Sequence, residues 1–96
     1  MTEYSTSMRL GQKSIWVDGE GQKIKIASMT LNHAENVCHW LRDNAVTLLM
    51  RVELEESGDN ESISTKRMLT ILAYPHEEIR KTNVYRAITK RIAQLQ

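Results

Sequence analysis

The chain has 96 residues, with 13 Lys or Arg and 12 Asp or Glu, so its formal net charge at pH 7 is +1. This length is enough for one domain, residues 1–96, and no apolar run approaches the roughly 20 residues that a membrane-spanning helix needs. The single cysteine, Cys38, cannot form an internal disulfide, and we therefore expect a cytoplasmic protein without a membrane partner.

The near-balance of charge conceals an uneven distribution along the chain. Residues 51–62 hold one basic and five acidic side chains, whereas residues 63–96 hold seven basic and two acidic side chains. The basic final third indicates an anionic partner, although a solvated helix face is the commoner reason for such a cluster. The total charge is well below that of strongly basic nucleic-acid-binding domains, so nucleic acid is a second choice.

The first predicted element is a β-hairpin at residues 13–28. Residues 1–12 before it are polar and are expected to be a loose lead-in. Ile24 and Ile26 alternate with lysines, and an Asp18-Gly19 pair lies between the two β-prone runs. Asp-Gly between such runs favours a hairpin because glycine accepts a positive φ.

A long helix is predicted over residues 30–56. Thr30 is a suitable N-cap, and an apolar seam follows at alternating spacings of three and four, which is typical of a helix packed along another helix. Residues 58–60 are predicted to form a turn. The seam consists of Leu31, Ala34, Cys38, Leu41, Ala45, Leu48 and Val52.

A C-terminal helical segment is predicted over residues 63–95. Residues 63–74 fit either a helix or a strand, and any helix there should stop before Pro75. The final helix should begin near residue 77 or 82, with Thr82 as a possible cap. The predicted fold class is therefore α+β: an N-terminal β-hairpin packed with two long antiparallel helices. The uncovered seam favours a homo-oligomer.

The sequence lacks the patterns expected of catalytic and metal sites. The three histidines and Cys38 do not have the spacing of metal ligands, so we expect no metal and no cofactor. Cys38 occupies the apolar seam, where cysteine usually behaves as a small buried residue rather than a nucleophile. We therefore predict that the protein is not an enzyme.

An anionic small molecule suits the scattered polar and aromatic side chains best. Basic residues near the C-terminus could hold phosphates, aromatic rings could stack on a base, and polar residues at a helix start could orient the ligand. Each of these residues also has an ordinary structural explanation in the core or on a solvated face. The candidate ligand-binding residues are Arg86, Arg91, Lys90, Tyr85, Asn36, His33 and Trp16.

The stretch "IWVDGEGQKIKIASMTLNHAENVCHWLRDNA" follows a pattern found in small phage proteins. An aromatic residue, a tight turn and a β-alternating segment precede M-T-x-x-H-x-x-N at the start of a helix, and "KTNVYRAITKRI" is similar to the closing helix of those proteins. The chain resembles the Thoeris anti-defence nucleotide-sponge family. The signature residues are Trp16, Gly19, Ile24, Ile26, Met29, Thr30, His33 and Asn36.

The resemblance implies a non-enzymatic phage protein that counters host defence, which is a form of immune evasion. Such proteins form homo-oligomers and sequester a cyclic nucleotide signal, of the cyclic ADP-ribose type or a cyclic oligonucleotide, in the host cell cytoplasm. Arg and aromatic side chains at subunit interfaces would bind that ligand. The alternative is a small phage or host regulatory protein that binds a protein or nucleic-acid partner through its helical face.

Overall fold

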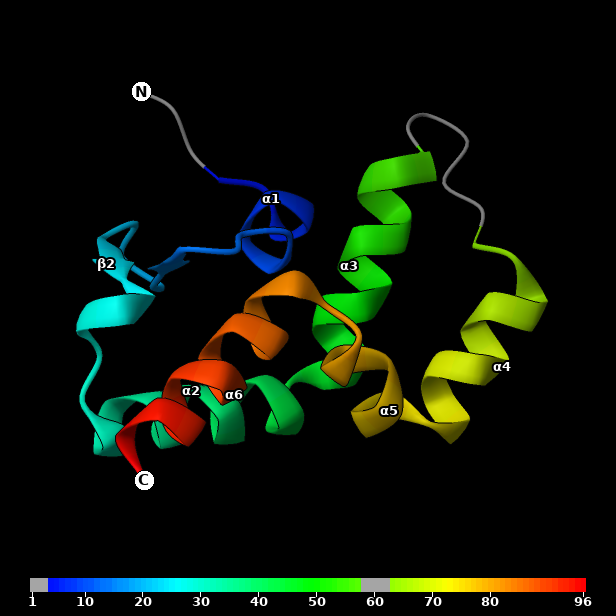
Figure 1. The fold of residues 1–96 in the computed structure, drawn as a ribbon. Helices are drawn as coiled ribbons and strands as arrows, with labels where there is room; N and C mark the ends of the chain where they lie inside the picture. Colours follow the sequence, from blue (N-terminus) through cyan, green and yellow to red (C-terminus); the bar gives the residue numbers. More distant parts are fainter. Residues whose placement is uncertain (1–3, 58–62) are drawn as a thin grey trace.

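The computed structural model describes residues 4–57 and 63–96 (Figure 1). The predicted turn at residues 58–60 lies outside this range. The elements, in chain order, are α1 (Thr6–Leu10), β1 (Ile15–Val17), β2 (Lys23–Lys25), the 3₁₀ helix η1 (Ile26–Ser28), α2 (Leu31–Asp43), α3 (Ala45–Ser57), α4 (Thr65–Ala73), α5 (Pro75–Arg80) and α6 (Asn83–Leu95).

The fold is mostly helical, so the predicted α+β class is wrong. Helices make up 70% of the structure, and the sheet in the described residues consists of two antiparallel strands of three residues each. The two long antiparallel helices are also replaced by shorter ones, none longer than 13 residues in the described part of the chain. The unpredicted break is at Asn44, whereas the predicted end of a helix before Pro75 is confirmed, because α4 ends at Ala73.

Asn44 divides the predicted helix of residues 30–56 into α2 and α3. Its backbone leaves the helical region, with φ −108° and ψ 15°, and its side-chain Nδ2 donates to the carbonyl oxygen of Trp40 at 2.8 Å. Asparagine is a weak helix former because its side chain competes for backbone groups in this way. The chain turns at Asn44, so that α3 rises away from α2 (Figure 1).

The apolar seam keeps its predicted role in α2. Thr30 caps this helix by accepting a hydrogen bond from the backbone N–H of His33 at 3.2 Å, as predicted. Ala34, Cys38 and Leu41 are buried, and α2 packs against α6. Beyond Asn44 the helices have different neighbours, since α3 packs against α1, α4 and α5.

The segment after residue 62 is divided at Pro75. Residues 65–73 form the helix α4, which resolves the helix-or-strand ambiguity, and Ser64 caps it by accepting from the N–H of Arg67. Pro75 is the first residue of α5, a position where its missing N–H costs nothing. Thr82 precedes α6 but does not cap it, because its hydroxyl donates to the carbonyl of Ile79 at 2.7 Å.

The hairpin has its strands inside the predicted range, but its turn differs. The N–H of Asp18 donates to the carbonyl of Gln22 at 3.0 Å, and the Asp18 carboxylate accepts from the N–H groups of Glu20 and Gln22 at 2.9 Å each. The positive φ, 84°, belongs to Gly21 rather than to Gly19. The turn therefore depends on the second glycine and on the carboxylate of Asp18.

Replacing Gly21 with alanine should destabilise the protein by about 1 kcal/mol, because a Cβ is strained at positive φ. Gly19→Ala is the matched control: no atom lies within 4 Å of its added Cβ, and its φ is not positive. Urea unfolding of both variants measures the difference. Equal stability of the two variants would contradict the turn described above.

Candidate ligand-binding pocket

A pocket of about 510 Å³ opens between the hairpin and helices α1, α2 and α3. We refer to it as the tryptophan pocket. Its volume lies within the range of about 300–1,000 Å³ typical of small-molecule sites. The lining residues are Thr6, Arg9, Leu10, Trp16, Val17, Gly19, Asn36, Val37, Trp40, Asn44, Thr47, Leu48 and Arg51.

One wall of the tryptophan pocket is a polar and aromatic stripe that continues from α2 into α3. Its members follow one another at spacings of four, four, three and four residues, which keep them on one side of successive helical turns. The stripe runs beside the apolar seam, so one surface faces the core while the adjoining surface faces the pocket. The stripe consists of Asn36, Trp40, Asn44, Thr47 and Arg51.

Two tryptophans meet at the pocket. Trp16 on β1 and Trp40 on α2 have ring centroids 5.8 Å apart at an interplanar angle of 72°, an edge-to-face pair. Trp16 is 7% exposed and belongs to the core, whereas Trp40 is 46% exposed. The pair thus offers an indole that is held by packing on one side and open on the other.

Helix α1 supplies Arg9 to the opposite wall. The sequence predicted a loose lead-in over residues 1–12. Residues 1–3 lie outside the described range, and for residues 6–10 the prediction is wrong, because they form α1, which is anchored at both ends. The Glu55 carboxylate on α3 accepts from the N–H groups of Thr6 and Ser7 at 3.0 and 2.8 Å. Leu10 is buried, and Asn83 Nδ2 on α6 donates to the carbonyl after it, that of Gly11, at 3.1 Å.

The charged side chains that line the tryptophan pocket are Arg9 and Arg51; no carboxylate lines it among the described residues. The remaining polar groups are amides and hydroxyls, of Asn36, Asn44 and two threonines. Such a lining combines cationic hydrogen-bond donors with an aromatic surface. It suits a ligand that carries both an anionic group and a planar ring.

Two of the seven candidate residues from the sequence, Trp16 and Asn36, meet in the tryptophan pocket. The other five lie elsewhere. Tyr85 is 5% exposed, and its hydroxyl accepts a hydrogen bond from Arg42 at 2.6 Å. Arg91 Nε donates to the backbone carbonyl of Met29 at 3.1 Å.

Arg86 and Lys90 are exposed on α6, and His33 is partly buried in the first turn of α2. None of the three lines the tryptophan pocket. Within one chain, therefore, the basic flank of α6 does not share a pocket with Trp16 and Asn36.

Sequence reasoning missed Arg9, Asn44, Thr47 and Arg51. The last three could have been found, because they continue the helical spacing that starts at Asn36 and Trp40. No such spacing marks Arg9. Its position depends on the docking of α1 against Glu55, which lies 49 residues after Thr6 and 48 after Ser7.

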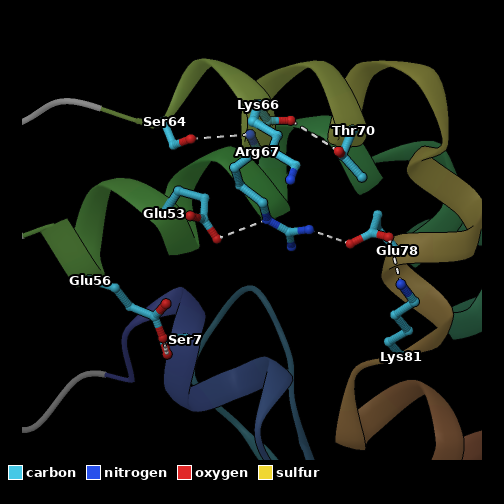
Figure 2. Close-up of polar contacts among 9 residues, drawn as sticks. All are labelled: Ser7, Glu53, Glu56, Ser64, Lys66, Arg67, Thr70, Glu78 and Lys81. Atoms are coloured by element: carbon cyan, nitrogen blue, oxygen red, sulfur yellow. Dashed lines mark hydrogen bonds and ion pairs between the residues drawn. The ribbon is translucent and has the colours of Figure 1, made fainter.

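A second hollow, of about 340 Å³, borders an ion-pair cluster that joins α3, α4 and α5 (Figure 2). Arg67 donates to Glu53 at 3.2 Å and also to Glu78, and Lys81 donates to Glu78 at 2.8 Å. The hydrogen bonds from Lys81 and Arg67 hold the pKa of Glu78 below the usual range of glutamate. These charges satisfy one another, so the cluster fastens helices rather than presenting an open site.

Cys38 has the structural role that the sequence predicted. It is a free cysteine, 3% exposed, in the core between α2 and its neighbours. Burial raises the pKa of its thiol above the ordinary value, and the nearby Arg42 only partly opposes this. A thiol in this state is a poor nucleophile at neutral pH.

Searches against protein-family models, curated proteins and solved structures found no match for this chain. The resemblance to the anti-defence sponge family thus rests on the sequence pattern. Every helix in residues 4–57 and 63–96 is too short or too polar to cross a membrane. In the same residues, no group of three or more His, Cys, Asp and Glu side chains is arranged to hold a metal ion.

Acid should loosen α1 from α3. Burial acts to raise the pKa of Glu55, but the hydrogen bonds from Ser7 and Thr6 outweigh it, so the pKa lies below the usual range of glutamate. The anchoring is therefore complete above about pH 4.3, the pKa in an unfolded chain, and is lost as the pH falls through the folded-state pKa.

We expect the hydrogen-exchange protection of the Thr6 and Ser7 amides to fall over that acidic range, before the protection of α2 falls. In Glu55→Gln the pH dependence should disappear, whereas Glu35→Gln, which removes an exposed carboxylate of α2, should retain it. Protection that is independent of pH in the wild-type chain would show that Glu55 does not anchor α1.

Proposed function

We propose that the protein binds and sequesters a cyclic nucleotide without chemical conversion, and that the tryptophan pocket is the binding site. The observation that carries this proposal is the combination of the half-exposed Trp40 with Arg9 and Arg51 around one hollow. A nucleotide has the matching parts, a planar base for the indole and phosphates for the guanidinium groups.

The lining chemistry supports binding without catalysis. Among the described residues, the groups around the tryptophan pocket are indole, amide, hydroxyl, guanidinium and aliphatic. General acid–base catalysis mostly uses histidine, carboxylate, lysine, tyrosine or cysteine side chains, and none of these lines the pocket among the described residues. Cys38, which could supply a nucleophile, is buried in the core instead.

The resemblance described above supports the choice of cargo. It makes cyclic ADP-ribose isomers and cyclic oligonucleotides the first ligands to test, and it implies a phage anti-defence protein that forms a homo-oligomer in the host cytoplasm. Light scattering of the purified chain measures the oligomeric state independently of any ligand.

Thermal unfolding with a panel of cyclic dinucleotides, cyclic trinucleotides and cyclic ADP-ribose isomers tests the proposal. A ligand at a hundredfold excess over its Kd adds about 2.7 kcal/mol of stability, which raises Tm by roughly 10–20 °C in a domain of this size. Heat should then release the ligand intact. Steady formation of a hydrolysis product would contradict sequestration, and a flat panel would contradict the proposed cargo.

Variants distinguish the tryptophan pocket from the basic flank of α6. Trp40→Ala should weaken binding by about 5–150-fold, the equivalent of the 1–3 kcal/mol that base stacking contributes. Leu72→Ala is the matched control, because Leu72 is an exposed apolar residue of α4 outside the pocket. Arg86→Ala with Lys90→Ala should leave binding unchanged. Loss of binding in this double variant alone would place the site on α6.

The alternative function, binding of a macromolecular partner through a helical face, is favoured by one observation. Leu69, Leu72 and Tyr74, at α4 and its C-terminal end, are each more than half exposed. A flat ligand panel together with a partner that binds the wild-type chain but not a Leu69→Ala, Leu72→Ala variant would support this alternative.

A further inference from the structure

We infer that Arg9 and Arg51 form an oxyanion seat that selects a phosphate group of the ligand, with Arg9 as the principal donor. This inference rests on the proposed function and adds which part of the ligand each wall of the tryptophan pocket recognises. No sequence motif identified Arg9 as a candidate for ligand binding.

The first observation is an unpaired donor. The Nε atom of Arg9 is buried and has no hydrogen-bond partner among the described residues. Buried polar groups in folded proteins are nearly always hydrogen-bonded, and an unpaired charged donor is especially costly. Arg9 also lines the tryptophan pocket. Because Nε has almost no accessible surface, a ligand acceptor in that pocket could pair with it once the Arg9 side chain turns toward the pocket.

The second observation is how firmly α1 holds Arg9. A five-residue helix is not stable by itself. Here Ser5 caps it by accepting from the N–H of Met8 at 3.1 Å, and Glu55 fastens its first two N–H groups. These contacts fix the backbone of α1 at Arg9. The guanidinium group therefore extends toward the ligand site from a backbone that is already ordered.

The third observation is the distribution of charge around the tryptophan pocket. Arg51 reaches it from α3 and adds a second guanidinium, and the described lining contains no carboxylate. Glu55, one helical turn beyond Arg51, interacts with Arg51 from outside the lining, which leaves Arg9 as the principal donor. Guanidinium groups bind phosphate with two parallel hydrogen bonds, a geometry that lysine cannot reproduce. The Asn44 Nδ2 donates one of its two hydrogens to the carbonyl oxygen of Trp40, which leaves the other N–H and the side-chain oxygen available to a ligand.

These observations divide the ligand between two parts of the tryptophan pocket. Arg9 and Arg51 would take the phosphate, and the exposed side of Trp40 would take the base. A carboxylate could satisfy the same guanidinium groups, so the ligand class is an oxyanion joined to a planar ring. The phosphate ester is the form consistent with the proposed function.

The test compares two probes, adenosine and adenosine 5′-monophosphate, by isothermal titration with the full chain at low salt. The wild-type protein should bind the monophosphate at least tenfold more tightly than adenosine, since a charge-assisted hydrogen bond is stronger than a neutral one. In Arg9→Gln most of this preference for the monophosphate should be lost, and adenosine binding should be unchanged. Arg9→Lys should recover only part of the difference, and Arg51→Gln should reduce it.

Arg80→Gln serves as the control, because Arg80 is exposed on α5 and does not line the tryptophan pocket. 5′-O-carboxymethyladenosine, in which a carboxylate replaces the phosphate, distinguishes the two oxyanions. Equal binding of adenosine and its monophosphate to the wild-type chain would overturn the oxyanion seat while leaving the proposed function intact. Failure of both probes and of every cyclic nucleotide would overturn both.

Discussion

The break at Asn44 is the constraint on which the rest of the structure depends. In an uninterrupted helix over residues 30–56, the whole apolar seam would pack against a single partner helix. The hydrogen bond from the Asn44 amide to the carbonyl of Trp40 ends α2 instead and starts α3 in a new direction. As a result α2 packs on α6, while α3 packs on α1, α4 and α5.

The same break shapes the tryptophan pocket. The stripe from Asn36 to Arg51 crosses the turn: Trp40 meets Trp16 of the hairpin, and Arg51 lies on α3, the helix that packs against α1. The hairpin is too small to be stable alone and contributes the buried Trp16, whereas α1 is fastened by Glu55 of α3. The pocket is therefore assembled from segments that are stable only when docked on the bent pair of helices.

The sequence predicted the features that depend on neighbours along the chain. Thr30 caps α2, the seam residues Ala34, Cys38 and Leu41 are buried, and the two strands lie within residues 13–28. These features depend on helical spacing, on capping chemistry and on strand alternation, all of which are local.

The errors have two physical causes: a local side-chain hydrogen bond at Asn44, which hydrophobic periodicity does not reveal, and long-range contacts that give structure to a polar segment. Periodicity continued through Asn44, so the interruption by one side-chain hydrogen bond went unnoticed. Arg9 lies in a polar segment that gains structure from its contacts with α3 and α6. Of the candidate site residues, Trp16 and Asn36 meet in the tryptophan pocket, whereas Tyr85 and Arg91 already have partners within the protein.

The central claim is that the tryptophan pocket, and not the basic flank of α6, receives the ligand. The chain has two tryptophans, so its ¹⁵N–¹H spectrum contains two indole N–H signals, which Trp40→Phe assigns. We would record this spectrum while cyclic nucleotides are added one at a time. One ligand should shift both indole signals in a saturable manner and leave the amide signals of Arg86 and Lys90 unmoved. Shifts confined to α6, or indole signals unmoved by every ligand, would contradict the central claim.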